Sequence, residues 1–150
     1  MVERDPHQLL ADANGLASAG RYEEAILAYE AAIAAGPTLR AYRLVVGELL
    51  FELQRYEAAA AVFEEEALTD PSRAQAFEAL ARARQMLGDR FGAIGAVDRA
   101  IALAPQWAEA IYLSALLHIE VEMEPQGRAL LKRALALDPN LAARATEDGL

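Results

Sequence analysis

The hydrophobic and small residues of this chain repeat with a long period, and proline marks each repeat. Four prolines follow one another at intervals of 34 residues, namely Pro37, Pro71, Pro105 and Pro139. Random placement rarely gives three equal intervals, so the chain contains an internal repeat. If each proline is taken as position 32 of its repeat, the four repeats span residues 6–39, 40–73, 74–107 and 108–141.

Two places in every unit hold a small residue. The eighth place is occupied by Ala13, Gly47, Ala81 and Ala115, and the twentieth place by Ala25, Ala59, Ala93 and Gly127. Four residues after the twentieth place comes a bulky apolar residue, which is Tyr29, Phe63, Val97 or Leu131. Small residues let two helices approach closely, where a large residue would cost about 1–3 kcal/mol of overpacking. The pattern therefore predicts two antiparallel helices in each unit.

The residues between these places are strong helix formers. Ala, Leu, Glu and Arg dominate the segments, and no alternating β-branched stretch occurs. Proline cannot extend a helix as an interior residue, and Gly20 and Gly88 suit the tight turn that follows a first helix. The predicted helices are 7–19 and 22–35, 40–53 and 56–69, 73–87 and 90–104, 107–121 and 125–137, and a short final helix from about Asn140.

The pattern resembles the tetratricopeptide repeat (TPR) family, whose signature is a 34-residue helix–turn–helix with small residues at these places. Residues 20–25, Gly-Arg-Tyr-Glu-Glu-Ala, are similar to the turn motif of that family. The resemblance implies an all-α fold, a right-handed superhelical solenoid of four antiparallel helix pairs. It implies one domain over residues 1–150, in which residues 142–150 form a C-terminal cap.

Two residues of the second repeat, 40–73, depart from the TPR pattern. Arg43 stands at a place that is usually apolar, and Glu66 at a place that is usually alanine. Because the start of a first helix lies beside the end of its antiparallel partner, we expect Arg43 and Glu66 to form an ion pair. The alternative is that both side chains reach solvent. Apart from these residues, the end units are expected to be the least regular, as caps usually are.

In TPR proteins the first helices line a concave groove that binds a peptide or a partner segment. When the groove positions of TPR proteins are transferred to this sequence, the resemblance implies a groove formed by all four repeats. Its residues are Leu10, Asn14, Leu44, Val45, Glu48, Phe51, Glu52, Glu78, Arg82, Gln85, Met86, Glu109, Tyr112, Leu113, Leu116, Ile119 and Glu120. Part of this apolar lining could instead be buried by neighbouring helices or by the cap.

The predicted groove combines apolar residues with an excess of acids. It holds five glutamates and a single base, Arg82, and its expected anchors are Phe51, Met86 and Tyr112. Some TPR domains hold a chaperone's C-terminal carboxylate with a lysine, asparagine and arginine clamp. Only Asn14 and Arg82 resemble that clamp, so the sequence favours a different partner. We expect a basic, partly apolar peptide or helix of another protein.

The last helix presents a second apolar face. Its residues are Leu130, Leu131, Ala134 and Leu137, and few residues follow to cover them. A short amphipathic cap could suffice. Otherwise the exposed face would favour a homo-oligomer or docking onto a larger complex.

Charge and composition exclude several function classes. The net charge is −9, which argues against a nucleic-acid partner, and there is no cysteine to serve as a nucleophile or metal ligand. His7 and His118 are far apart in sequence, and the adjacent acids of 64–66 point in different directions on a helix. We therefore expect no metal, no cofactor and no enzymatic activity.

Neither a signal peptide nor a membrane span is expected. The N-terminus is charged, and the longest apolar runs, such as 31–35 and 58–63, fall far short of the ~18 residues that cross a bilayer. The sequence therefore predicts a cytoplasmic protein without membrane insertion.

Together these features predict a non-enzymatic protein–protein interaction module, acting as an adaptor, scaffold or assembly factor. Two alternatives remain open at this point. One is a small acidic secretion-type chaperone for a single client. The other is a structural subunit of a larger complex, docked through its flanks or ends. The scaffold alone does not identify the partner.

Overall fold

The computed structural model describes residues 4–150, which form nine α-helices, one 3₁₀ helix and no strand. The all-α prediction is therefore confirmed. The chain divides into two compact units, Met1–Thr69 and Asp70–Leu150.

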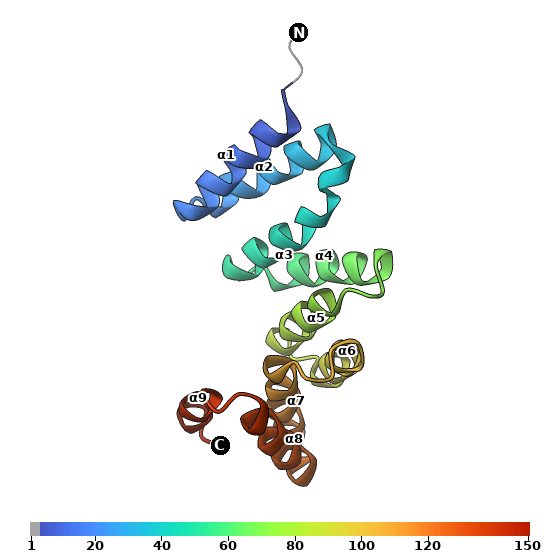
Figure 1. Cartoon of the computed structure of the whole chain (residues 1–150), viewed down its shortest axis with the longest axis vertical. Helices are drawn as coiled ribbons and strands as arrows, with labels where there is room; N and C mark the ends of the chain where they lie inside the picture. Colours follow the sequence, from blue (N-terminus) through green and yellow to red (C-terminus); the bar gives the residue numbers. More distant parts are fainter. Residues whose placement is uncertain (1–3) are drawn as a thin grey trace. The chain divides into compact units, whose positions relative to one another are not determined.

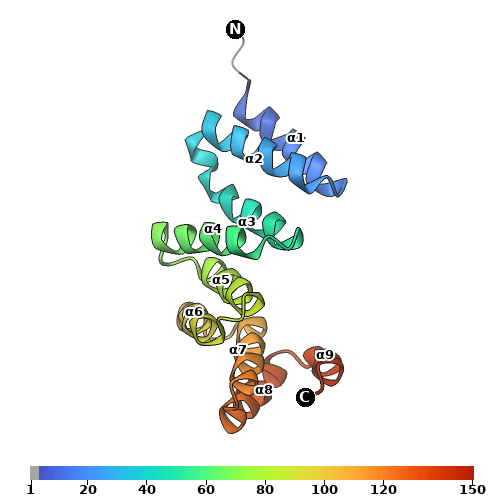
Figure 2. The same cartoon turned by 180° about the vertical axis from the view of Figure 1, so that it is seen from behind.

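The first unit is built from two helix pairs. Its elements are α1 (Pro6–Ser18), α2 (Tyr22–Ala35), the 3₁₀ helix η1 (Pro37–Tyr42), α3 (Arg43–Glu52) and α4 (Tyr56–Thr69). Both views show α1 beside α2 and α3 beside α4 (Figures 1 and 2). The core of the unit joins α1, α2 and α3 through Ala13, Ala25, Tyr29, Val46 and Leu49.

The second unit has two helix pairs and a short last helix. Its elements are α5 (Ala74–Met86), α6 (Arg90–Leu103), α7 (Ala108–Glu120), α8 (Glu124–Leu137) and α9 (Leu141–Glu147). Pro125 lies in the first turn of α8, where its missing N–H removes no helical hydrogen bond. Each predicted helix of this unit is present with its boundaries shifted by no more than two residues.

The small places of the repeat lie where helices touch. All six alanines at the eighth and twentieth places have no exposed surface: Ala13, Ala25, Ala59, Ala81, Ala93 and Ala115. At Gly47 an added Cβ would lie 2.4 Å from Cε1 of Phe63, and at Gly127 it would lie 2.9 Å from the backbone oxygen of Ala115. The size limit read from the sequence thus comes from direct contact between paired helices.

The turns inside the four helix pairs share one backbone conformation. Gly20 and Gly88 have positive φ values of 75° and 83°, as their place in the turn requires. Gln54 and Glu122 occupy the same place and also have positive φ, at 59° and 63°. The turn geometry is therefore kept in the two pairs that lack the glycine.

The main irregularity lies in the second repeat, not at the ends, so that part of the prediction is wrong. The helix expected over 40–53 begins as the 3₁₀ helix η1, and α3 starts only at Arg43. Leu39 of η1 is buried in a cluster with Leu9 and Ala32. Through this contact η1 packs against α1 and α2.

The expected ion pair of the second repeat is confirmed. Nε of Arg43 lies 3.4 Å from Oε1 of Glu66, a residue that is only 4 % exposed. Arg40 lies 3.2 Å from the same carboxylate, and Glu65 pairs with both arginines. Two arginines and two glutamates thus form one network, which compensates the burial of Glu66.

The last helix, α9, covers the end of the chain as predicted. Leu141 and Ala145 of α9 are buried in one cluster with Ile111, Leu131 and Ala134. An ion pair of 2.8 Å joins Arg144 to Glu109, 35 residues earlier. The same separation of 35 residues joins Gln85 of α5 to Glu120 of α7 at 2.8 Å. Side chains of α9 and of α7 are thus joined at the same sequence separation as side chains of α7 and of α5.

Candidate functional site

The predicted groove residues lie on the first helix of each helix pair, and we call the surface of these helices within each unit its first-helix face. In the first unit it belongs to α1 and α3. Leu10 and Val45 are half-buried against the core. Asn14 accepts a hydrogen bond of 2.6 Å from the hydroxyl of Tyr29, so its side chain also holds the helix pair together.

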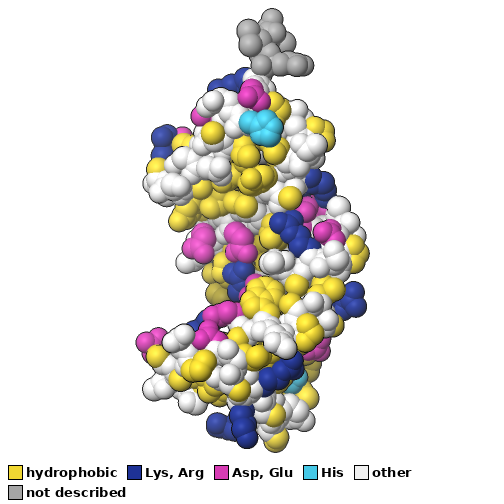
Figure 3. Space-filling model, in the orientation of Figure 1, with side chains coloured by type: hydrophobic (Ala, Val, Ile, Leu, Met, Phe, Trp, Pro, Cys, Tyr) yellow, Lys and Arg dark blue, Asp and Glu magenta, His cyan; other side chains and the backbone are white. Residues whose placement is uncertain are grey.

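The α3 part of this face combines acids with apolar side chains. Glu48 and Glu52 are one helical turn apart, and Glu52 is exposed. Leu44 and Phe51 are half-buried on the same helix, and the Phe51 ring meets the edge of Tyr56 at a centroid distance of 5.1 Å. In Figure 3 acidic side chains gather at the left end of α3, beside hydrophobic side chains of the same unit. The predicted apolar and acidic character is present here.

In the second unit the acids of the face have arginine partners. Glu78 pairs with Arg82 at 2.9 Å on α5. Glu120 accepts hydrogen bonds from Gln85 and from Arg90, the latter at 3.0 Å. Glu109 pairs with Arg144, as described above. The predicted groove residues include five acids and one base. Arg90 and Arg144, which are not among those residues, pair with Glu120 and Glu109 and so reduce the excess of negative charge.

Two of the predicted lining residues are buried and cannot serve as open anchors, which corrects the prediction for Tyr112 and Leu113. Tyr112 has no exposed surface, because α9 covers it. Its hydroxyl donates a hydrogen bond to Asp148, and the guanidinium of Arg144 lies 4.7 Å from the ring centroid. Burial, with the Asp148 carboxylate second, raises the pKa of Tyr112 to about 12.

Three apolar residues of the predicted groove remain in the second unit, and they differ in exposure. Met86 is 52 % exposed at the end of α5. Leu116 and Ile119 of α7 are half-buried. On α3, Glu48 and Glu52 lie on the same helix as the half-buried Leu44 and Phe51.

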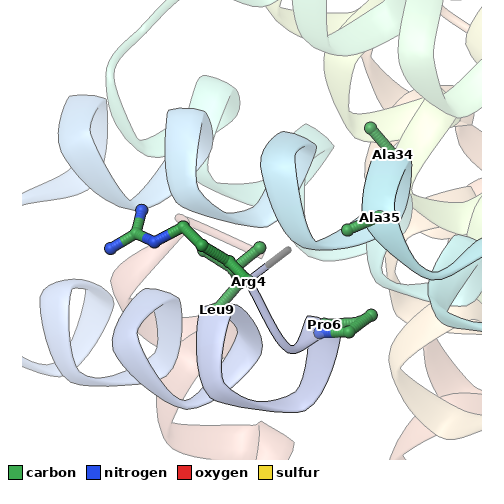
Figure 4. A pocket seen from close by; sticks show the side chains of 5 residues that line it. All are labelled: Arg4, Pro6, Leu9, Ala34 and Ala35. Atoms are coloured by element: carbon green, nitrogen blue, oxygen red, sulfur yellow. The ribbon is translucent and has the colours of Figure 1, made fainter. Parts of the chain in front are cut away.

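A hollow at the start of the chain was not expected from the sequence. It measures about 310 Å³ and is lined by Arg4, Pro6, Leu9, Ala34 and Ala35 (Figure 4). Its lining offers one charged side chain and no acid, histidine or hydroxyl, so it holds no set of groups for acid–base or nucleophilic chemistry. Within residues 4–150 no cluster of three or more histidine and acidic side chains could hold a metal ion.

The comparisons with known proteins concern the fold. No protein-family model and no curated protein matches the sequence. MamA from Desulfovibrio magneticus RS-1, from residue 41 to the end, superposes with a TM-score of 0.82 and 19% identity, covering 92% of this chain and 78% of that one. A second MamA structure gives a TM-score of 0.81 and 22% identity over 89% of this chain and 73% of that one.

The fold is that of a TPR-like helical-repeat solenoid. A double mutant of MamA RS-1 gives the same TM-score of 0.82 over 92% of the chain. At these identities the likeness shows the fold alone, and it agrees with the helix pairs predicted from the 34-residue period. Among the described residues, no helix combines the length and the apolar character that crossing a membrane requires.

Proposed function

We propose that this chain is a non-enzymatic protein-interaction module that binds a segment of another protein on the first-helix face of its first unit. The observation that carries the proposal is the surface of α3, where Leu44 and Phe51 lie beside Glu48 and Glu52. TPR-like solenoids are interaction scaffolds, which supports the functional class.

The chemistry of α3 favours a basic, partly apolar segment. An aromatic ring and a leucine supply apolar contact area, since aromatic residues contribute strongly to interface energies. The two carboxylates attract lysine or arginine and reject acidic segments. The second unit contributes fewer apolar anchors, because α9 covers Tyr112 and Leu113 is buried. The proposed site is thus narrower than the groove predicted from the sequence.

Selection from a displayed peptide library tests this proposal. The wild-type chain should enrich peptides with lysine or arginine next to leucine or an aromatic residue. A Glu48→Lys/Glu52→Lys variant should lose these peptides, because the charge of the face is reversed while the apolar residues stay.

The matched control is Glu30→Lys/Glu57→Lys, which makes the same charge change on the second helices of the same unit. Loss of the peptides by both variants, or by neither, would refute a site on α3. A circular dichroism spectrum of each variant shows that the helices are retained.

A further inference from the structure

The outer surface of α4, on the second helix of its pair, carries acids around an exposed leucine. Glu57, Ala61, Glu64 and Leu68 are spaced by four, three and four residues, so they share one face of the helix, and all four are exposed. Leu68 is 77 % exposed, the highest value among the large hydrophobic residues described. α4 has four glutamates and no basic residue.

The equivalent surface of α8 has the opposite charge. Pro125, Ala129, Lys132 and Ala136 occupy the same four places of the repeat, 68 residues later, and all are exposed. Arg128 and Arg133 flank this row. Arg128 pairs at 2.7 Å with Glu124, the only acid of the helix, and Arg133 donates a hydrogen bond to the backbone oxygen of Pro105. Two alanines and a proline leave this face flat between its positive charges.

The same asymmetry holds for the two units as a whole. Residues 1–69 contain twelve acids and five bases, whereas residues 70–150 contain eleven acids and nine bases. The first unit is therefore strongly acidic, and most of the bases that offset the acids of the second unit are arginines. A surface that is basic and flat in an otherwise acidic chain suits an acidic surface with a protruding apolar residue.

We propose that the outer face of α8 binds the outer face of α4 of a second copy of this chain. In this contact Leu68 packs on Ala136, while Lys132 faces Glu57 and Glu64 of the other copy. The two faces differ, so the contact is heterologous, and copies can add one after another. It lies on second helices, which leaves the first-helix face open for a partner.

Crosslinking can test this contact with unusual clarity, because Lys132 is the only lysine of the chain. A carbodiimide joins an amine directly to a carboxylate, so apart from the N-terminal amine every crosslink must start at Lys132. In an equal mixture of ¹⁴N- and ¹⁵N-labelled full-length chains at low salt, we expect mixed-isotope crosslinks from Lys132 to Glu57 or Glu64. Crosslinks only within one copy, or only to acids outside α4, overturn the proposal.

Charge reversal gives a second and independent test. In sedimentation velocity at low salt, Lys132→Glu alone and Glu57→Lys alone should each weaken self-association at least tenfold. An equal mixture of the two variants should restore association, because each supplies the charge that the other has lost. Glu30→Lys is the matched control on α2 and should leave association unchanged. A wild-type chain that stays monomeric at low salt, or a mixture that fails to associate, overturns the proposal.

Discussion

Gly47 lies directly against the ring of Phe63, a side chain with no exposed surface. A methyl group at this position would come within 2.4 Å of the ring, and the ring has no solvent into which it can move. The small residue at the eighth place therefore sets how closely α3 and α4 approach. The sequence pattern revealed this limit without revealing which atom imposes it.

Gly47→Ala should destabilise the chain by about 1–3 kcal/mol, because it overpacks a closed contact. Gly15→Ala in α1 is the control, since nothing lies within 4 Å of its added Cβ. That control should stabilise the chain by about 0.5–1 kcal/mol, as alanine favours the helix. Urea unfolding followed by circular dichroism measures both, and equal midpoints for the two variants would contradict the packing argument.

The buried Glu66 forms ion pairs with two arginines, Arg40 and Arg43, and this leads to a second prediction. Glu66→Ala should destabilise the chain by about 1–3 kcal/mol, since Arg43 then loses a charged partner. Arg43→Leu/Glu66→Ala removes both charges and should recover most of the loss. The free energies of unfolding of the single and double variants decide the matter. A double variant that is less stable than the single one would contradict the pairing.

At the scale of the elements, α9 is the part with the most consequence. It forms only two helical turns, and its contacts with α7 include Asp148 on Tyr112 and Arg144 on Glu109. Without this helix, Ile111, Leu131 and Ala134 would lose the side chains that cover them. α9 therefore replaces the neighbour that a further repeat would supply.

The raised pKa of Tyr112 makes stability depend on pH in a defined window. The unfolded tyrosine ionises near pH 10, whereas burial and Asp148 raise the pKa of the folded residue to about 12. Between these values the folded state holds one proton more, so stability is fully present below pH 10 and falls as the pH rises towards 12. Tyr112→Phe removes this titration.

The urea midpoint of the wild type should therefore fall more between pH 8 and pH 11 than that of Tyr112→Phe. The variant is expected to start from a lower midpoint at pH 8, because it lacks the hydrogen bond to Asp148. Burial also raises the pKa of Tyr29. Because Tyr29 is present in both proteins, its contribution to the pH dependence is the same in both and cancels in the comparison. Parallel pH profiles would show that Tyr112 is not the responsible group.

The helices themselves could be predicted almost completely, because the small residues, prolines and turn glycines all recur with the same period. The 3₁₀ helix η1 was missed, since its cause is the burial of Leu39 against Leu9 and Ala32, which are distant in sequence. The four turns also show that a glycine marks the left-handed position without being required there, as Gln54 and Glu122 demonstrate.

At the scale of the whole molecule, the candidate site was predicted less well than the fold. The period places residues on the first-helix face, but it does not show which charges are neutralised. Two polar contacts, Gln85 of α5 with Glu120 of α7 and Glu109 of α7 with Arg144 of α9, span 35 residues each. A search for charges of opposite sign at that separation would have found the pair of Arg144 and Glu109. The burial of Tyr112 depends on how α9 packs, which the 34-residue pattern alone does not show.

The most direct test of the central claim is to locate a bound peptide on the full-length chain. A ¹⁵N-labelled chain is titrated with a basic, apolar peptide from the library selection, and the amide chemical shifts are followed by NMR. We expect the largest shift changes on α3, between Leu44 and Glu52, and on the adjoining residues of α1. Changes concentrated on the outer faces of α4 and α8, or on α9, would contradict a binding site on the first-helix face.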